Sequence, residues 1–301
     1  MYLQIKTTIF IKNYCLVISM DSFVLRLDNA KKALDESGHV LIGAGAGLSS
    51  AAGILYGGER FTSNFQDFIE KYAMKDMYSS GFYPFKTSEE KWAYWARHID
   101  VNRYSVGKTD VYQKLLNLVK DKDYFVLTTN VEHQFWINDF EDKRIFATQG
   151  DYGLFQCSKA CHDKLYHNKN IISEMLFKTK DCKIPTKLIP KCPVCGAEMD
   201  INLRKDNLFV QDKKWHEMNK NYSRFLDKIN DSKVVFLEMG VGYNTPSIIR
   251  FPFEQMTFNN PNATLIRLNL DYPQSTEENM DKTIGFDEKI EEILDYWLSR
   301  I

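Results

Sequence analysis

Four short apolar stretches, separated by helix-like segments, limit most strongly how this chain can fold. They are HVLIGAG from His39, DYFVLTTN from Asp123, KVVFLEMGVG from Lys233 and ATLIRLNLD from Ala263. The first three are continuous apolar runs that include β-branched residues, which is typical of strands covered on both faces. The fourth alternates more, and we expect it to lie nearer an edge of the sheet. Each stretch therefore predicts one buried strand.

Helical segments connect these strands. The segment 28–38 begins with Asp28 as a predicted cap and ends at Gly38, and the segments 108–123 and 285–301 repeat apolar residues at helical spacing. Alternating strands and helices predict an α/β fold with a doubly wound, parallel, Rossmann-like sheet. Ligands of such sheets bind beyond the carboxyl ends of the strands. Three of these ends carry Gly, Thr or Asn, and we expect them to converge on one crevice.

Two insertions interrupt this predicted core. Residues 56–107 are rich in aromatic side chains and predict a small helical insertion, and residues 151–200 hold most of the cysteines. The Rossmann-like domain then comprises 21–55, 108–150 and 201–301. Residues 1–20 form a leader of uncertain status. Met20 is an alternative start of translation, and a weak signal peptide is the less favoured interpretation.

Composition excludes several classes of function. The 301 residues include 39 Lys and Arg against 40 Asp and Glu, so the formal net charge is −1. The chain therefore lacks the excess of basic residues that would indicate a nucleic-acid partner. No apolar run approaches the roughly 18 residues that a membrane span needs. We therefore expect a cytoplasmic protein without a membrane partner.

Two closely spaced cysteine pairs predict a metal site. The pairs are Cys157 with Cys161 in CSKAC, and Cys192 with Cys195 in CPVCG. Such pairs, a few tens of residues apart, are typical of a tetrahedral four-cysteine zinc site, whereas disulfides fit a cytosolic chain poorly. Cys182 or His162 could replace one ligand. Because protein atoms fill all four positions, we expect a structural zinc ion.

The stretch VLIGAGAGLSSAAG, from Val40 to Gly53, predicts a dinucleotide site. Gly43, Gly45 and Gly47 follow a strand and precede a helix, where backbone N–H groups favour phosphate. The G-x-G-x-x-G spacing of ordinary dehydrogenases fails, because position 48 is Leu and position 50 is Ser. We therefore predict a dinucleotide site of another type, with a ligand-free glycine turn as the alternative.

Several motifs together resemble the sirtuin family. GAGLSSAAGI (45–54) resembles the sirtuin GAG-x-S-x-x-x-GI motif, and TTNVEH (128–133) resembles T-x-N-I-D. A four-cysteine module follows, as in sirtuins. The phrases GAGAGLSSAAG, QGDYGLFQCS and GVGYNTPSIIRFPFE resemble the class M, macrodomain-linked microbial sirtuins. The resemblance covers nearly the whole chain after residue 20.

The resemblance implies NAD as cofactor and a set of residues that bind it. These residues are Gly43, Ala44, Gly45, Ala46, Gly47, Ser49, Ser50, Arg60, Thr129, Asn130, Glu132, Gln149, Gly240, Val241, Gly242, Asn269 and Asp271. The alternative to NAD contact is a surface position for Arg60 and turn formation for Asn269 and Asp271. Glu132 replaces the aspartate of the family motif.

The resemblance also implies protein ADP-ribosyltransfer, because one catalytic residue departs from the deacetylases. Their general base is a histidine followed by glycine, and here the pair is Gln149–Gly150. Glutamine cannot accept a proton at neutral pH. Deacetylation needs a base for its second stage, whereas direct transfer of ADP-ribose does not. Asn130 and Gln149 are therefore the predicted catalytic residues, and His133 is the alternative base.

Partners and competing activities complete these expectations. The resemblance implies a lipoylated carrier of the glycine-cleavage H type as acceptor, and a macrodomain hydrolase that reverses the modification. The alternatives are an NAD-dependent deacylase that tolerates Gln149, an NAD hydrolase, and a non-catalytic sensor of NAD or ADP-ribose. The ribose-activating amide of Asn130 argues against a sensor, which does not need it.

Overall fold

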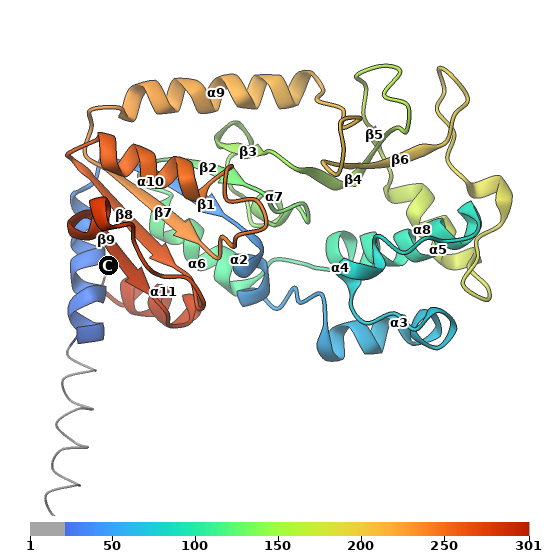
Figure 1. Cartoon of the computed structure of the whole chain (residues 1–301), viewed down its shortest axis with the longest axis horizontal. Helices are drawn as coiled ribbons and strands as arrows, with labels where there is room; N and C mark the ends of the chain where they lie inside the picture. The colour runs from blue at the N-terminus through green and yellow to red at the C-terminus, as the bar shows by residue number, and fades with distance from the viewer. Residues whose placement is uncertain (1–21, 301) are drawn as a thin grey trace, which may run out of the picture.

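The computed structural model describes residues 22–300, so the predicted leader over 1–20 lies outside the described residues. A parallel, six-stranded sheet forms the centre of the larger part of the molecule (Figure 1). The strand order is β3-β2-β1-β7-β8-β9, which confirms the doubly wound arrangement. The strands are β1 (His39–Ala44), β2 (Asp123–Thr128), β3 (Ile145–Ala147), β7 (Val234–Met239), β8 (Ala263–Leu268) and β9 (Thr283–Phe286).

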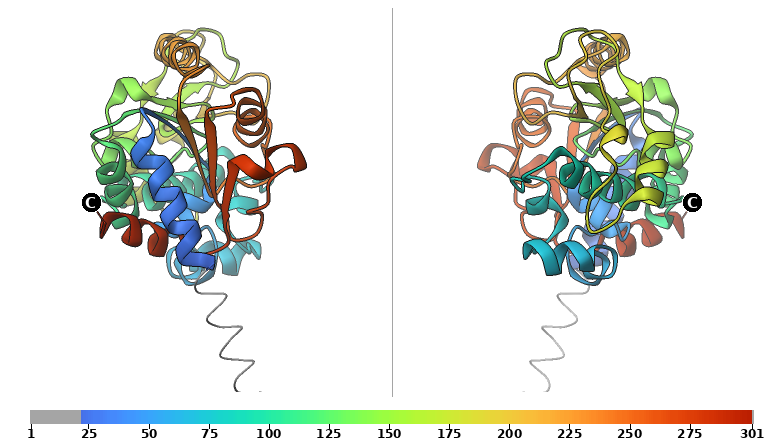
Figure 2. Two further views of the ribbon diagram at one scale, coloured as in Figure 1. Left: turned by 90° about the vertical axis from the view of Figure 1, so that its left-hand side faces the viewer. Right: turned by 90° about the vertical axis from the view of Figure 1, so that its right-hand side faces the viewer.

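Helices cover both faces of this sheet (Figures 1 and 2). One face packs against the helix over residues 22–36, α2 (Ala46–Ala51), α6 (Asp110–Val119), α7 (Gln134–Ile137) and α11 (Ile290–Leu298), and the other against α9 (Lys213–Ile229) and α10 (Arg250–Asn259). Alternate residues of one strand serve the two faces: Val40 and Ile42 pack on the first, and Leu41 packs on the second. Continuous apolar runs in the sequence follow from this double coverage.

The fourth predicted strand, β8, is second from the edge of the sheet, nearer to it than β1 and β7, and β9 pairs with its outer side. Two details differ from the sequence-based expectations. The segment 285–301 was predicted to be helical throughout, but its first residues belong to β9 and α11 begins only at Ile290. Asp28 lies inside the first helix rather than at its start, and it accepts a hydrogen bond from Tyr296 at 2.8 Å.

The helical insertion and the cysteine segment together form a second, smaller unit (Figure 1). It contains α3 (Gly58–Tyr72), α4 (Met77–Ser80), α5 (Ser88–Ile99) with its π-helical extension η1 (Asp100–Tyr104), α8 (Lys169–Lys178) and the 3₁₀ turn η3 (Thr186–Leu188). Its antiparallel sheet has the order β5-β4-β6, from β4 (Gly150–Cys157), β5 (Tyr166–His167) and β6 (Met199–Leu203). Two further 3₁₀ turns, η2 (Asp142–Arg144) and η4 (Glu277–Lys282), lie in the larger part.

A single hydrophobic cluster joins the two insertions. Trp92 of α5 packs against Phe155 of β4 with ring centroids 5.0 Å apart, and the cluster continues from Phe61 and Phe65 to Met199 and Ile201. Most aromatic residues of the helical insertion are therefore core residues of this smaller unit. Within residues 22–300, no helix is both long enough and apolar enough to cross a membrane.

Candidate functional site

A cavity of about 500 Å³ lies where the larger and smaller units meet. Residues after β1, β2 and β7 line one side, as expected for the carboxyl ends of parallel strands. The predicted site residues among its lining are Gly45, Ala46, Thr129, Asn130, Gln149, Val241 and Gly242. The three predicted strand ends therefore converge on one cavity, and Gln149 of the β3–β4 connection joins them.

Glycine is required at positions 43, 45 and 47 by packing within the protein rather than by the close approach of a ligand. A Cβ atom on Gly45 would lie 2.6 Å from the carbonyl oxygen of Gly240, and one on Gly47 would lie 2.5 Å from the Cα of Gly240. The β1 and β7 loops thus press directly against each other. A Cβ atom on Gly43 would meet Ile249 and Phe253 side chains at 2.4 and 2.6 Å, so this glycine serves the packing of α10.

Asn130 belongs to a buried polar network beneath the glycine loop. Its Nδ2 donates to the carbonyl oxygen of Gly45 at 2.9 Å, and its backbone N–H donates to Oγ1 of Thr128 at 3.0 Å. The carboxylate of Glu132 accepts from Ser49 Oγ at 2.6 Å and from the Tyr112 hydroxyl at 3.2 Å. Ser49 and Glu132 are thus part of the scaffold behind the cavity rather than of its lining.

The burial of Glu132 shapes its chemistry. The side chain is only 3% exposed, and burial raises its pKa above the ordinary value, against the effect of the hydrogen bonds from Ser49 and Tyr112. The backbone N–H of Val131 also donates to this carboxylate at 3.0 Å. Glu132 therefore fixes the turn that carries Asn130, and sequence reasoning missed its partner Tyr112.

Gln149 presents a free amide to the cavity. Its backbone oxygen accepts from the N–H of Arg204 at 3.0 Å, which fixes the position of the main chain. Within residues 22–300, the side-chain amide makes no hydrogen bond to the protein. It is therefore available to a bound ligand as both donor and acceptor.

The remaining predicted NAD contacts lie elsewhere. Arg60 donates to the carbonyl oxygens of Leu55 and Val101 and to Asn102, so the guanidinium is engaged within the smaller unit. Asn269 donates to the carbonyl oxygen of Val241 at 2.8 Å and accepts from the N–H of Asp271 at 3.1 Å, a turn at the end of β8. Gly43, Ala44, Gly47, Ser50 and Gly240 are also outside the cavity lining.

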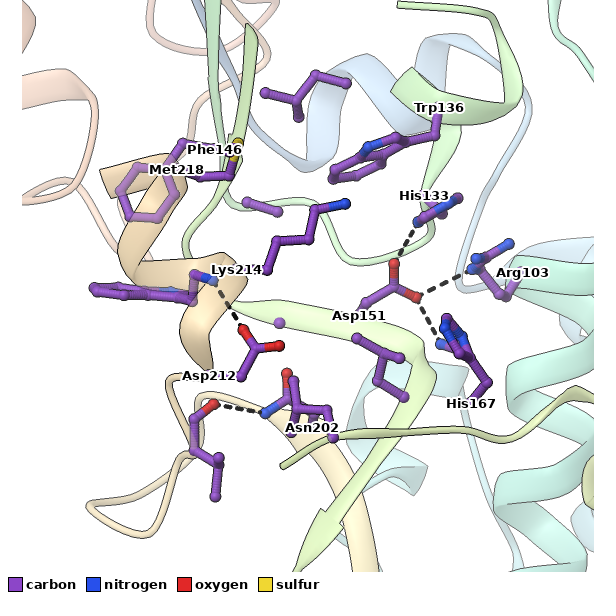
Figure 3. Close-up of a pocket in the computed structure, with 18 residues that line it drawn as sticks. Arg103, His133, Trp136, Phe146, Asp151, His167, Asn202, Asp212, Lys214 and Met218 are labelled. Atoms are coloured by element: carbon purple, nitrogen blue, oxygen red, sulfur yellow. Dashed lines mark hydrogen bonds and ion pairs between the residues drawn. The ribbon is translucent and has the colours of Figure 1, made fainter. Parts of the chain in front are cut away.

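His133 faces a second cavity of about 260 Å³, separate from the first (Figure 3). It adopts the left-handed conformation, with φ of +71°, and its ring stacks on Trp136 with centroids 4.4 Å apart. Its Nδ1 contacts the carboxylate of Asp151, which also accepts from Arg103 Nε at 3.1 Å. The alternative base is therefore absent from the cavity that holds Asn130 and Gln149.

The pair of His133 and Asp151 has a structural consequence. Burial raises the pKa of Asp151, but the contacts with His133 and Arg103 outweigh it and hold the pKa below its ordinary value. Asp151 is two residues after Gln149, and His133 is three residues after Asn130. The pair therefore clamps together the two chain segments that carry the predicted catalytic residues. His167 lines this second cavity as well (Figure 3).

Sequence reasoning missed the wall of the first cavity that the smaller unit supplies. This wall contains Tyr56, Met77, Tyr78, Phe82, Lys91, Trp95, His98, Tyr152, Asp200 and Arg204, among others. These residues come from the α2–α3 connection, α4 and the segment after it, α5, β4, and β6 with the segment that follows it, far apart in the sequence. Their aromatic pattern alone indicated a core, and no local motif distinguishes the cavity-lining members.

The four predicted cysteine ligands come together at one point. Sγ atoms of Cys157, Cys161, Cys192 and Cys195 all lie within 4.8 Å of one another, with separations of 3.5 Å for Cys157–Cys195 and 3.7 Å for Cys161–Cys192. Four thiolates at about 2.3 Å from a tetrahedral zinc ion would be about 3.8 Å apart. The geometry therefore fits a structural zinc ion. Gly196, with φ of +70°, completes the turn after the second pair.

The two alternative ligands have different positions. Cys182 is buried in the core of the smaller unit, where burial and the nearby carboxylate of Asp67 raise its pKa to about 11. It is not part of the cysteine cluster. His162 Nδ1 lies 3.1 Å from Sγ of Cys161 and 3.9 Å from Sγ of Cys192, so this imidazole borders the cluster.

Comparisons with curated proteins place this chain beside two relatives. It is 36% identical over 276 residues to a protein ADP-ribosyltransferase of Staphylococcus aureus, covering 91% of this chain and 88% of the relative. It is also 30% identical over 241 residues to a probable bifunctional ADP-ribose hydrolase/ADP-ribosyltransferase of Fusarium oxysporum f. sp. cubense. That match covers 76% of this chain and 40% of the relative. No family model matches the chain.

Solved structures of similar architecture are Sir2 homologues. A Sir2 homologue in complex with NAD has a TM-score of 0.58 at 13% identity, covering 91% of this chain and 93% of the other. Sir2Tm bound to a propionylated peptide has a TM-score of 0.58 at 14% identity, covering 91% and 98%. At this level of identity the likeness establishes a shared fold.

Proposed function

Because this chain belongs to the sirtuin-type protein ADP-ribosyltransferases, we propose that it transfers ADP-ribose from NAD to a protein acceptor with release of nicotinamide. The cavity at the strand ends is the proposed NAD site. Its volume of about 500 Å³, the free amide of Gln149 and the backbone N–H of Ala46 at the start of α2 suit a large polar ligand.

One observation carries the choice of transfer over deacylation: among the described cavity-lining residues, none is a free base. His98 is the histidine of this lining, and burial lowers its pKa to about 3 while both ring nitrogens are engaged. Burial raises the pKa of Asp200, but ion pairs with Lys91 and Lys205 outweigh it and keep the pKa low. A reaction that needs a general base is therefore poorly served here.

The proposed roles of Asn130 and Gln149 follow from what direct transfer requires. NAD supplies a ribose whose bond to nicotinamide breaks with both electrons leaving on nicotinamide, while the acceptor nucleophile bonds to the ribose carbon and releases its proton to water. The protein has to hold the ribose and stabilise positive charge there. We assign this to the side-chain oxygen of Asn130, and we assign hydrogen bonds to ribose hydroxyls to Gln149.

Removing the Gln149 amide tests its positioning role. Gln149→Ala is expected to lower the transfer rate about 3- to 10-fold, the value of roughly one hydrogen bond, without a change in thermal stability. The fold should persist because the backbone bond from Arg204 remains. Initial rates at saturating NAD measure the effect, with Gln255→Ala on α10 as the matched control, because this exposed side chain bonds to Asn259 of the same helix. A rate equal to that of the wild type would refute the positioning role.

We further propose a lipoylated carrier of the glycine-cleavage H type as acceptor, and a macrodomain hydrolase as the partner that removes the modification. The name of the Fusarium relative joins an ADP-ribose hydrolase with an ADP-ribosyltransferase in one chain, which supports a functional link of this kind. The sequence motifs that resemble the class M sirtuins support both partners. A cytoplasmic location is part of this proposal.

The decisive experiment offers two acceptors in one reaction. Purified protein is incubated with NAD labelled on the adenosine side, a lipoylated H-type carrier and an acetyl-lysine peptide, and mass spectrometry follows the label. We expect the label on the carrier protein. Label in free O-acetyl-ADP-ribose with a deacetylated peptide would establish a deacylase and overturn the proposal. Free ADP-ribose without either product would establish an NAD hydrolase.

The unlipoylated carrier is the matched control for the acceptor. We expect much less label on it than on the lipoylated form, because the proposal assigns recognition to the modified carrier. Equal labelling of both forms would keep the transferase but reject lipoyl recognition. If neither carrier is labelled and NAD is consumed only when the peptide is present, both the transferase activity and lipoyl recognition are rejected.

A further inference from the structure

A chain of hydrogen bonds runs through the smaller unit and ends at the wall of the NAD cavity. The hydroxyl oxygens of Tyr56 and Tyr152 lie 2.7 Å apart, and the Tyr152 hydroxyl lies 3.0 Å from Nε2 of His98. Nδ1 of His98 lies 3.1 Å from the hydroxyl of Tyr94, which lies 2.8 Å from the carbonyl oxygen of Met77. Tyr56, Tyr152 and His98 all line the cavity.

The hydrogen bond from Tyr94 to Met77, at the end of this series remote from Tyr56, fixes the direction of every other bond in the series. A carbonyl oxygen only accepts, so the single hydroxyl proton of Tyr94 is donated to Met77. Tyr94 then has only lone pairs for His98, and Nδ1 of His98 has to be the donor. This network assigns the Nδ1–H tautomer of His98.

His98 passes this direction on because it is neutral. It is 1% exposed, and burial lowers its pKa to about 3. A neutral imidazole carries one N–H group, so Nε2 is an acceptor and takes the proton of the Tyr152 hydroxyl. The oxygen of Tyr152 in turn accepts the proton of Tyr56. Each proton of the chain is thereby committed.

The hydroxyl of Tyr56 consequently has nothing to donate to the cavity. Its proton points to Tyr152, so it can offer a ligand only the lone pairs of its oxygen. A ligand group beside it has to carry an N–H or O–H bond. A carboxylate there would face a lone pair without a proton between the two oxygens, which is repulsive.

We propose that Tyr56 is a specificity-determining residue that accepts a hydrogen bond from the carboxamide of the pyridine ring of NAD, and so rejects the nicotinic acid form of the dinucleotide. This inference rests on the proposed function. Tyr56 lies two residues after Ile54, whose N–H bonds to the carbonyl oxygen of Ser49 in α2, and it lines the same cavity as Gly45 and Ala46 of the glycine loop. The exposed side chains of Tyr78 and Phe82 line another part of this cavity.

Calorimetric titration tests the proposal without relying on turnover. The full chain is titrated with NAD, with nicotinic acid adenine dinucleotide and with ADP-ribose, which lacks the pyridine ring. We expect the wild type to bind NAD at least about 10-fold more tightly than the acid form. Tyr56→Phe is expected to weaken NAD binding about 5- to 10-fold, as for the loss of roughly one hydrogen bond, and to leave ADP-ribose unchanged.

A second variant is expected to strengthen the binding of nicotinic acid adenine dinucleotide, the acid form. Tyr152→Phe removes the acceptor of the Tyr56 proton and frees that proton for the ligand, so the acid form should bind more tightly than it does to the wild type. Tyr296→Phe, which removes a hydroxyl on α11 far from the chain of bonds, is the matched control and should change neither preference.

The outcomes separate this inference from the proposed function. Wild-type protein that binds neither NAD nor ADP-ribose would reject the proposed function. If ADP-ribose binds normally and Tyr56→Phe retains the full preference for NAD over the acid form, the role of Tyr56 is rejected while the function stands. A Tyr152→Phe variant that still excludes the acid form as the wild type does would also overturn the assigned proton direction.

Discussion

Cys192→Ser is expected to abolish metal binding and to unfold the smaller unit, the largest effect of any single substitution considered for this chain. The variant leaves three thiolates at a site whose four Sγ atoms lie within 4.8 Å of one another. Structural zinc supplies about 10–16 kcal/mol in zinc-finger peptides, comparable with or larger than the roughly 5–15 kcal/mol that stabilises a whole domain. The metal content should fall from about one zinc ion per chain to near zero.

The matched control is Cys182→Ser, because Cys182 is buried in the same unit but outside the cluster. That variant should keep its zinc ion and most of its thermal stability. Elemental analysis and thermal unfolding measure both effects. His162 borders the cluster and is a potential substitute ligand, so the double variant Cys192→Ser/His162→Ala is measured too. Full zinc content and unchanged unfolding in the double variant would contradict a structural metal site at these cysteines.

Asn130→Ala is expected to lower the maximal transfer rate about 100- to 1,000-fold, the cost of removing one preorganised polar group at a centre where charge develops. The side chain lies in the cavity beside Gln149 and is held by the carbonyl oxygen of Gly45. Rates at saturating NAD and saturating acceptor measure the loss. The exposed Asn117 on α6 provides the matched control, because Asn117→Ala removes the same group far from the cavity.

Asn130 also supports the glycine loop, and the measurement has to separate this role from catalysis. A loss of the support alone would weaken ADP-ribose binding in proportion to the loss of rate. A catalytic role leaves ADP-ribose binding within about two- to threefold of the wild type while the rate at saturation falls. A rate within tenfold of the wild type would contradict the role that we propose for Asn130.

The parallel sheet and the metal site were predictable because each depends on a local pattern. Apolar runs buried on both faces mark β1, β2 and β7, and the two cysteine pairs carry their own turns. Strand β9 was missed because it is only four residues long and has no apolar run. Its one buried residue, Phe286, is covered by Phe23 and Trp297 from distant parts of the sequence. The expectation that β8 lies nearer an edge than β1 and β7 is confirmed, with β9 on its outer side.

The candidate site was predictable only on the side built by strand ends. Asn130 and Gln149 stand in motifs, and both line the cavity. The opposite wall, with Tyr56, His98 and Tyr152, depends on contacts between segments up to 96 residues apart, which no local pattern records. The glycines were read as space for a ligand, whereas Gly45 and Gly47 are dictated by the backbone of Gly240, almost two hundred residues later.

The hydrophobic cluster shared by the two insertions makes the core of each insertion depend on residues of the other. Phe61 and Trp92 come from the first insertion, and Phe155 and Met199 come from the second, yet all four belong to one core. Grafting residues 151–200 alone onto a related scaffold would leave half of that core without its complement. A chimera that exchanges 56–107 together with 151–203, a range that includes Ile201 and all of β6, keeps these core residues together. We therefore expect the two stretches to be exchangeable between related chains only as a pair.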